Sequence, residues 1–307
     1  MALLIATPDR DATELAQHIR DRDASIDLRI WPDLGDESDI RFVLAWKPPE
    51  GLFRQLPNLK AVSSLGAGVD ALIGNPEIPD EVAIGRLAGP RLAANMAAYL
   101  VAVVVAHWKR LPGFIEDRRY RRWNPWVPER PPVIGLLGTG EMGRRAAAAF
   151  RELEFPIHGF SRSGRGPDSV RMYSGTRGLQ EIANTSDVLI NLLPLTRETR
   201  NILDAALFSQ MREGSSLINV GRGEHLVEDD LLEALARDRP GCAVLDVFCN
   251  EPLPNNHPFW THPKIFMTPH CASITLTAEA AELAVESYHR VLAGKPPLGS
   301  VDRENGY

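Results

Sequence analysis

The chain has 307 residues, of which 44% are apolar and 24% are charged, a composition typical of globular proteins long enough for two domains. Its formal net charge of −6 argues against nucleic acid or an anionic membrane as a partner, because a general attraction to either needs positive charge. The three cysteines, Cys242, Cys249 and Cys271, lack the spacing of a disulfide framework or of a zinc site. We therefore expect no metal and a reducing, cytoplasmic setting.

The first part of the chain alternates short apolar runs with helical patterns, which predicts βα units and a mainly parallel sheet. The N-terminal run has no basic region before it, so it is interpreted as a strand and not as a signal peptide. The expected strands cover 3–7, 28–31, 42–46, 59–63 and 82–85, with helices over 11–20 and around 51–55.

A glycine-rich stretch over 65–70 follows, where a strand should give way to a helix. The next element is a long helix over about 93–110 that is apolar on most faces, which is typical of a helix buried between domains or subunits. Its longest apolar run, 97–106, is about half of what a transmembrane helix needs.

The segment 112–132 interrupts this pattern with five prolines, Trp123, Trp126 and a basic run over 118–122. A basic run can bind nucleic acid, but the acidic chain and the lack of a surrounding binding motif favour a solvated or subunit-contacting arm.

A second α/β series begins at 133. The expected strands cover 133–137, 158–161, 188–192, 216–220, 243–247 and 265–268. One helix begins at Glu141, and a last helix over about 275–292 should return the chain to the first domain.

The first strand of this second series leads into a glycine loop. Gly138, Gly140 and Gly143 form a Gly-x-Gly-x-x-Gly pattern between an apolar strand and an alanine-rich helix. In dinucleotide-binding folds the first glycine makes a tight turn, the second lets pyrophosphate approach the backbone, and the third allows close helix packing. The phosphates then meet the positive end of the helix, so the sequence predicts a dinucleotide site.

The next strand carries information about the cofactor. NAD-binding units place Asp or Glu at its end to hold the ribose 2′-hydroxyl, whereas this strand ends in Ser161, Arg162 and Ser163. These side chains could bind a 2′-phosphate by charge and hydrogen bonds, although Arg162 could also be a solvated loop residue. We expect NADP(H) as the preferred cofactor, with NAD(H) possible.

Three later strands end in residues that together suit a reduction. Arg222, Glu251 and His270 each follow an expected strand of the second series, and the carboxyl ends of parallel strands share one sheet edge. Singly, each is also typical of an ordinary turn, surface or core residue. Together, His270 could protonate the oxygen of a ketone that receives hydride, and Glu251 would favour the charged imidazolium. Arg222 could hold the carboxylate of a 2-oxo acid. Asp246 competes with Glu251 as the partner of His270, but its place inside a strand favours packing or cofactor contacts.

These residues resemble those of the D-isomer-specific 2-hydroxyacid dehydrogenase family. The glycine loop, Gly221-Arg222-Gly223, Glu251-Pro252 and Pro269-His270 stand in the family's order, and shorter matching segments extend over nearly the whole chain. The resemblance implies an α/β fold of two doubly wound parallel-sheet domains and a homodimer. A Rossmann coenzyme domain, 95–274, would be inserted in a flavodoxin-like substrate domain made of 1–94 and 275–307.

The resemblance also implies site residues and substrates. The main-chain amides near Ala67 and Gly68 would hold the substrate carboxylate, and Trp46 would crowd the pocket, although a core or rim tryptophan is as typical. The most similar branch of the family implies glyoxylate and hydroxypyruvate as substrates, with NADPH. The implied cofactor contacts add a further set to the glycine loop and to 161–163: Glu141, Met142, Leu193, Pro194, Val220, Gly221, Asp246 and Ala272.

Two other functions stay open from the sequence. One is an NAD-dependent dehydrogenase of a larger 2-hydroxy acid. The other is a cofactor-sensing binding protein on the same fold, against which the joint presence of Arg222, Glu251 and His270 argues.

Overall fold

The computed structural model describes residues 1–306, which form two compact units. Unit 1 comprises residues 1–92 and 274–306, and unit 2 comprises residues 93–273. The family resemblance implies divisions after residues 94 and 274, and the domain roles assigned to these parts stay a prediction.

Unit 1 contains one parallel sheet of five strands in the order β2-β1-β3-β4-β5. Its elements are β1 (Ala2–Ala6), α1 (Thr13–Arg22), β2 (Asp27–Ile30), η1 (Glu37–Asp39), β3 (Ile40–Ala45), η2 (Phe53–Gln55), β4 (Ala61–Ser64), α2 (Asp70–Ile73), β5 (Ala83–Arg86) and α9 (Thr277–Leu292). This strand order is that of flavodoxin-like folds, as expected.

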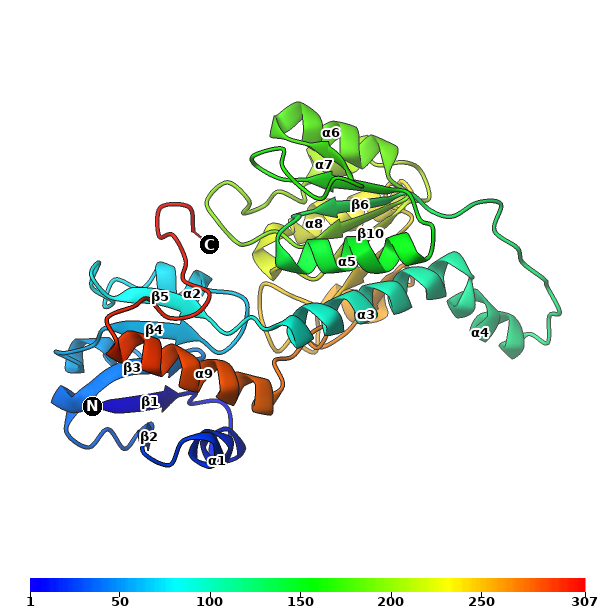
Figure 1. Ribbon diagram of the computed structural model, residues 1–307. Coiled ribbons are helices and arrows are strands. Elements are labelled where there is room, and N and C mark those ends of the chain that lie inside the picture. Colours follow the sequence, from blue (N-terminus) through cyan, green and yellow to red (C-terminus); the bar gives the residue numbers. More distant parts are fainter. Residues whose placement is uncertain (307) are drawn as a thin grey trace. The chain divides into compact units, whose positions relative to one another are not determined.

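Both faces of the unit 1 sheet are buried, because successive side chains of a strand point to opposite faces. Leu3 and Ile5 of β1 belong to one cluster with side chains of α1 and α9, whereas Leu4 belongs to a second cluster with η2 and α2. Figure 1 shows α9, in red, beside the strands that it covers. Helix α9 therefore completes the domain that the N-terminal residues begin.

Unit 2 contains a parallel sheet of seven strands in the order β12-β11-β10-β9-β6-β7-β8. Its elements are α3 (Pro90–Trp108, which begins in unit 1), α4 (Leu111–Arg119), β6 (Ile134–Leu137), α5 (Glu141–Glu152), β7 (Ile157–Phe160), β8 (Arg171–Tyr173), α6 (Gly175–Thr185), β9 (Val188–Asn191), α7 (Ala205–Gln210), β10 (Ser216–Asn219), η3 (Gly223–His225), α8 (Glu228–Ala236), β11 (Cys242–Leu245), η4 (Pro258–Thr261) and β12 (Ile265–Met267). The order reverses direction at β6, as in a Rossmann fold with one added strand. The predicted fold class is confirmed.

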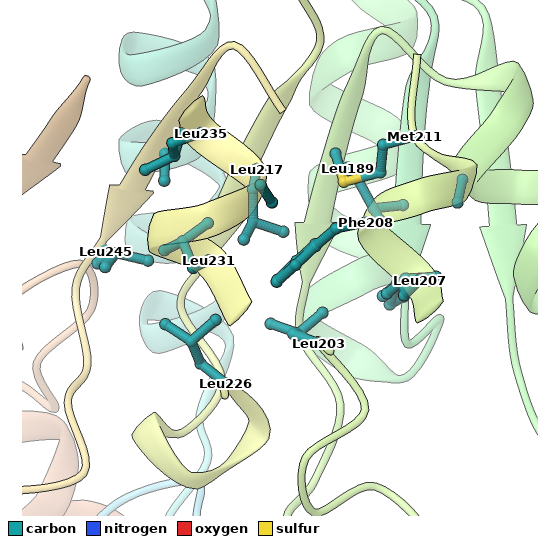
Figure 2. Close-up of a cluster of buried hydrophobic side chains, with 14 of the residues drawn as sticks. Leu189, Leu203, Leu207, Phe208, Met211, Leu217, Leu226, Leu231, Leu235 and Leu245 are labelled. Atoms are coloured by element: carbon teal, nitrogen blue, oxygen red, sulfur yellow. The ribbon is translucent and has the colours of Figure 1, made fainter. Parts of the chain in front are cut away.

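Helices cover both faces of this second sheet. On one face, leucines from β9, β10 and β11 pack against α7 and α8, and Figure 2 shows Phe208 among them. On the other face, Leu136, Ile190 and Ile218 pack against α3 and α5. Because helices cover both faces, the carboxyl ends of the strands stay open, and ligands bind there in such folds.

By length and composition alone, helix α3 is long and apolar enough to cross a membrane, but core helices of globular proteins have the same properties. Met96, Leu100 and Val104 of α3 are buried in the core of unit 2. The helix thus extends beyond the apolar run 97–106 that the sequence marked, and it contributes to a domain core.

The segment 112–132 differs from expectation at its start. Residues 111–119 form helix α4, with Pro112 in its first turn, where a proline costs no hydrogen bond because the first N–H groups of a helix have no partner. This helix was not predicted from the sequence. The short edge strand β8 and the helices α6 to α8 were also not predicted.

Candidate active site

The glycine loop joins β6 to α5, and its three glycines have different surroundings. Gly138 has φ of +100°, which side chains disfavour. A Cβ on Gly143 would lie 2.1 Å from the carbonyl oxygen of Gly138, whereas a Cβ on Gly140 would meet nothing within 4 Å. The chain's own packing therefore requires Gly143, and Gly140 leaves an open approach to the N-terminus of α5. This cradle fits a dinucleotide pyrophosphate.

The loop after β7 is folded against the glycine loop. The Ser161 hydroxyl and the Thr139 hydroxyl both donate to the carbonyl oxygen of Arg165, at 2.8 and 3.2 Å, and the Arg165 N–H donates to Ser163 Oγ at 3.3 Å. Arg162 is exposed on this loop. The serines thus shape the turn that presents Arg162.

A carboxylate on another loop lies within range of the Arg162 charge. Hydrogen bonds from its own main-chain N–H and from Thr196 lower the pKa of Glu198, and the charges of Arg162 and Arg197 lower it further. Glu198 belongs to the loop after β9, two strands from Arg162 in the sheet order. The motif for cofactor choice concerns only the acid at the end of β7, so the sequence did not indicate Glu198 as a neighbour of Arg162.

Glu251 and His270 are brought together as expected. Glu251 Oε2 lies 2.7 Å from His270 Nδ1, and Glu251 Oε1 accepts a hydrogen bond from the Phe248 N–H at 3.0 Å. The carboxylate is therefore held by its own loop while it contacts the ring. Both side chains are partly exposed, His270 at 37% and Glu251 at 27%, so the pair is accessible from solvent.

Asp246 supports His270 through the main chain and not through the ring. Its carboxylate accepts hydrogen bonds from the Cys271 and Ala272 N–H groups at 2.9 and 3.0 Å and from the Thr268 hydroxyl. The His270 N–H donates to the Asp246 carbonyl at 2.8 Å, and His270 has φ of +51°. Such a conformation is costly for a non-glycine residue and persists only where the surroundings enforce it. Buried Asp246 therefore anchors the loop that presents the imidazole.

The glycines on either side of Arg222 let its loop pack close to the loop that carries Glu251. A Cβ on Gly223 would lie 2.0 Å from the Phe248 carbonyl carbon, so the Arg222 loop packs directly against the loop that carries Glu251. The Arg222 Nη1 donates to the Gly221 carbonyl at 2.8 Å. The structure thus places Arg222, Glu251 and His270 on neighbouring loops after β10, β11 and β12.

The remaining expected cofactor residues also lie on unit 2. Glu141 and Met142 form the first turn of α5, and Leu193 and Pro194 follow β9. Val220 and Gly221 follow β10, and Ala272 follows His270. Their locations cluster at the carboxyl edge of one sheet.

The sequence did not predict three buried polar residues near the site. Asn191, Asn219 and His225 have no exposed surface and are joined to one another and to the Arg222 main chain by hydrogen bonds. A usable signal was present, because Asn191 ends an otherwise apolar strand and Asn219 follows the apolar pair Leu217 and Ile218 at the end of β10.

The substrate residues expected in unit 1 lie at the carboxyl ends of its strands. Trp46 follows β3, and its indole Nε1 is buried without a hydrogen-bond partner among residues 1–306. The Arg10 guanidinium lies 4.0 Å from the Trp46 ring centroid. Ala67 and Gly68 are half-buried in the turn between β4 and α2. Within the described part of the chain, no group of three His, Cys, Asp or Glu side chains could hold a metal ion.

Comparison with known proteins agrees with this geometry. Residues 101–272 match the family model of the D-isomer specific 2-hydroxyacid dehydrogenase, NAD binding domain. The chain is 34% identical to glyoxylate/hydroxypyruvate reductase A of Yersinia enterocolitica and 37% identical to that of Photorhabdus laumondii, over 100% of each chain.

Solved structures of the same family are also similar to this chain. A D-isomer specific 2-hydroxyacid dehydrogenase from Xanthobacter autotrophicus, in complex with NADPH and MES, is 34% identical with a TM-score of 0.95, over 100% of this chain and 99% of that one. An NADPH-dependent glyoxylate/hydroxypyruvate reductase from Sinorhizobium meliloti, in complex with NADP and sulfate, is 30% identical with a TM-score of 0.91, over 100% of both chains.

The expected family, oxidoreductase class and nicotinamide cofactor are thereby confirmed. A glycine loop of Rossmann geometry, a carboxylate–imidazole pair on the same sheet edge and full-length similarity all agree: this chain belongs to the D-isomer specific 2-hydroxyacid dehydrogenase family.

Proposed function

We propose that the protein reduces small 2-oxo acids, glyoxylate and hydroxypyruvate, to glycolate and D-glycerate with NADPH. The observation that carries this proposal is the 2.7 Å contact between Glu251 and His270 at the edge of the sheet that also bears the glycine loop. The names of the full-length relatives support the choice of substrates.

The geometry of the site supports the following catalytic roles. NADPH, when bound, supplies a hydride to the carbonyl carbon, which leaves negative charge on the carbonyl oxygen. His270 donates a proton to that oxygen, and the 2.7 Å contact with Glu251 fixes the orientation of the ring. Arg222 binds the substrate carboxylate, for which its planar guanidinium is suited.

The cofactor residues are assigned by place. Gly138, Gly140 and Gly143, with Glu141 and Met142, would hold the pyrophosphate at the N-terminus of α5. Ser161, Arg162 and Ser163 would hold the 2′-phosphate, and the remaining contacts would come from the loops after β9 to β12: Leu193, Pro194, Val220, Gly221, Asp246 and Ala272. Preference for NADP(H) over NAD(H) is supported by the exposed Arg162 and by solved relatives in complex with NADPH or NADP.

Substrate recognition by unit 1 is part of the proposal. The main-chain amides at Ala67 and Gly68 would bind the carboxylate, and the half-buried Trp46 would restrict the size of the group beside it. Its stacking with Arg10 supports a fixed ring position.

The test is a substrate panel with both cofactors. Loss of reduced-nicotinamide absorbance is followed with glyoxylate, hydroxypyruvate, pyruvate and a branched 2-oxo acid. Rapid NADPH oxidation with the first two is expected. Faster turnover with NADH and the branched acid would instead indicate a dehydrogenase of larger substrates, and cofactor binding without any turnover would indicate a binding protein.

We further propose a homodimer, supported by exposed apolar side chains on and after α4. Trp123 is 98% exposed, Val127 82% and Ile115 58%, more apolar exposure than a solvated arm needs. Light scattering after gel filtration should give the mass of two chains. Trp123→Ser with Val127→Ser should shift it toward one chain, whereas Trp260→Ser, at a tryptophan that is 54% exposed on η4, should not.

A cytoplasmic setting completes the proposal, without nucleic acid or membrane as partner. It is supported by three free thiols, of which Cys249 and Cys271 are exposed, and by the packing of α3 in a domain core. Recovery of the protein in the membrane fraction after cell lysis would contradict it.

A further inference from the structure

A closed hydrogen-bond network lies behind the Arg222 loop. Asn191 Nδ2 donates to Asn219 Oδ1 and to His225 Nδ1, both at 2.9 Å. Asn219 Nδ2 donates to the Arg222 carbonyl at 3.0 Å. All three side chains have no exposed surface, so each polar atom depends on its protein partners.

The network continues into the two loops that flank it. Asn191 Oδ1 accepts from the Leu193 N–H, and Asn219 Oδ1 accepts from the Gly221 N–H, both at 3.2 Å. A Cβ on Gly221 would lie 2.8 Å from Asn191 Nδ2. The side chains therefore fill the space that this glycine leaves, and they bind main chain on both sides.

The proton positions on His225 follow from its partners. The Arg222 main-chain N–H lies 3.0 Å from His225 Nδ1, and a main-chain N–H can only donate. Nδ1 is therefore an acceptor, so a neutral ring carries its proton on Nε2. Nε2 lies 3.2 Å from the Pro194 carbonyl oxygen, to which it donates. One imidazole thus joins the loop after β9 to the loop after β10.

We propose that His225, held by Asn191 and Asn219, is a positioning residue for the reduction: it fixes the main chain of Arg222 and couples it to the Leu193–Pro194 loop. This inference rests on the proposed function, in which Arg222 binds the substrate and the loop after β9 contacts the cofactor. Three buried polar side chains at a core position would otherwise be costly, since apolar residues fill such sites without polar groups to satisfy.

Two substitutions separate the two ends of the ring. His225→Asn places an amide oxygen near the position of Nδ1 and keeps the acceptor for the Arg222 N–H, but loses the donor to Pro194. His225→Gln places an amide nitrogen near the position of Nε2 and keeps the donor, but loses the acceptor. His262→Gln is the matched control, because His262 Nδ1 accepts the Lys264 N–H at 3.3 Å away from this network.

The expected results differ between the two variants. An unsatisfied Arg222 N–H should make His225→Gln raise KM for glyoxylate about tenfold, with NADPH affinity unchanged. His225→Asn should weaken NADPH binding about threefold, measured by nicotinamide fluorescence. Its KM for glyoxylate should stay near the wild-type value, because the acceptor for the Arg222 N–H is kept. His262→Gln should change neither constant.

A double-substitution cycle tests whether the effect passes through Arg222. In an Arg222→Ala background, His225→Gln should add little to the loss of kcat/KM, because coupled residues are not additive. Full additivity, or kinetic constants equal to wild type in His225→Gln despite a lowered melting temperature, would overturn the proposal and leave a purely structural cluster. If the wild-type enzyme reduces no 2-oxo acid, the proposed function fails, whereas the NADPH affinity of His225→Asn still decides the coupling to Pro194.

Discussion

His270 Nδ1 lies 2.7 Å from Glu251 Oε2, and the second carboxylate oxygen of Glu251 is held at 3.0 Å by the Phe248 N–H. One carboxylate oxygen therefore binds the main chain, which fixes the side chain, and the other contacts the imidazole. With Nδ1 facing Glu251, Nε2 is the ring atom left to deliver a proton.

Substitution of His270 by alanine should remove most turnover. Loss of a general acid costs about 10²- to 10⁴-fold in rate, whereas the glycine loop that binds the cofactor is untouched. Initial-rate assays with glyoxylate measure turnover, and NADPH titrations measure cofactor binding separately. His257→Ala is the control, because His257 forms a similar pair with Glu228 at 3.1 Å outside the site. Unchanged turnover in His270→Ala would remove this residue from the mechanism.

Glu251→Gln should lower turnover without loss of NADPH binding. An amide nitrogen cannot accept a hydrogen bond, so glutamine cannot serve both the Phe248 N–H and His270 Nδ1 as the two carboxylate oxygens do. The kcat for glyoxylate and an NADPH titration measure the two effects separately. Wild-type kcat in this variant would show that the reduction does not need the carboxylate beside His270.

Gly140 and Gly143 should respond differently to alanine. In Gly143→Ala the new Cβ would collide with the Gly138 carbonyl, and such overpacking costs about 1–3 kcal/mol of folding free energy. In Gly140→Ala the protein leaves room for the Cβ, so the melting temperature should stay unchanged while the Kd for NADPH rises about tenfold, or 1.4 kcal/mol. Thermal unfolding and fluorescence titration distinguish the two; wild-type affinity in Gly140→Ala would place the pyrophosphate elsewhere.

Arg162→Asp should shift the cofactor preference toward NADH. A carboxylate at this place repels a 2′-phosphate and can accept hydrogen bonds from a ribose hydroxyl. The ratio of kcat/KM for NADPH and NADH is the measurement, and Arg177→Asp, at an exposed arginine on α6, is the control for added negative charge. An unaltered ratio would assign the 2′-phosphate to another residue.

Asp187 should make stability depend on acid pH. Although burial raises its pKa, hydrogen bonds from the Arg130 guanidinium and the Val133 N–H, with the charges of Arg130 and Arg212, hold the pKa below the ordinary 3.8. A carboxyl with a lower pKa in the folded chain stabilises the fold above its unfolded pKa, and that contribution is lost as pH falls through the folded value. Asp187→Asn should therefore cost about 1–3 kcal/mol of unfolding free energy at pH 7.

The difference between wild type and Asp187→Asn should shrink below about pH 4. Urea unfolding of both proteins over a pH series measures it. A difference that is constant with pH would mean that the ion pairs at Asp187 contribute nothing to stability.

Much of this protein was predictable from local pattern. The glycine loop and the strand ends that carry Arg222, Glu251 and His270 follow from short motifs and hydrophobic periodicity, which are properties of neighbouring residues. The domain boundaries were implied only by the family resemblance. Helix α4 was not predicted, because the five prolines in 112–132 interrupt the helical pattern of the sequence. Only Pro112 lies in the helix, where it occupies a tolerated position in the first turn.

Only the tertiary structure decided how distant residues meet. Asp246 and Glu251 were both possible partners of His270 by sequence, and the choice depends on which carboxylate faces the ring and which faces the main chain. The network of Asn191 and His225 joins residues 34 apart, and it arises because β9 and β10 are adjacent in the sheet. Sequence determines which strands and loops form, but strand order and side-chain direction, which only packing sets, decide which polar groups become partners.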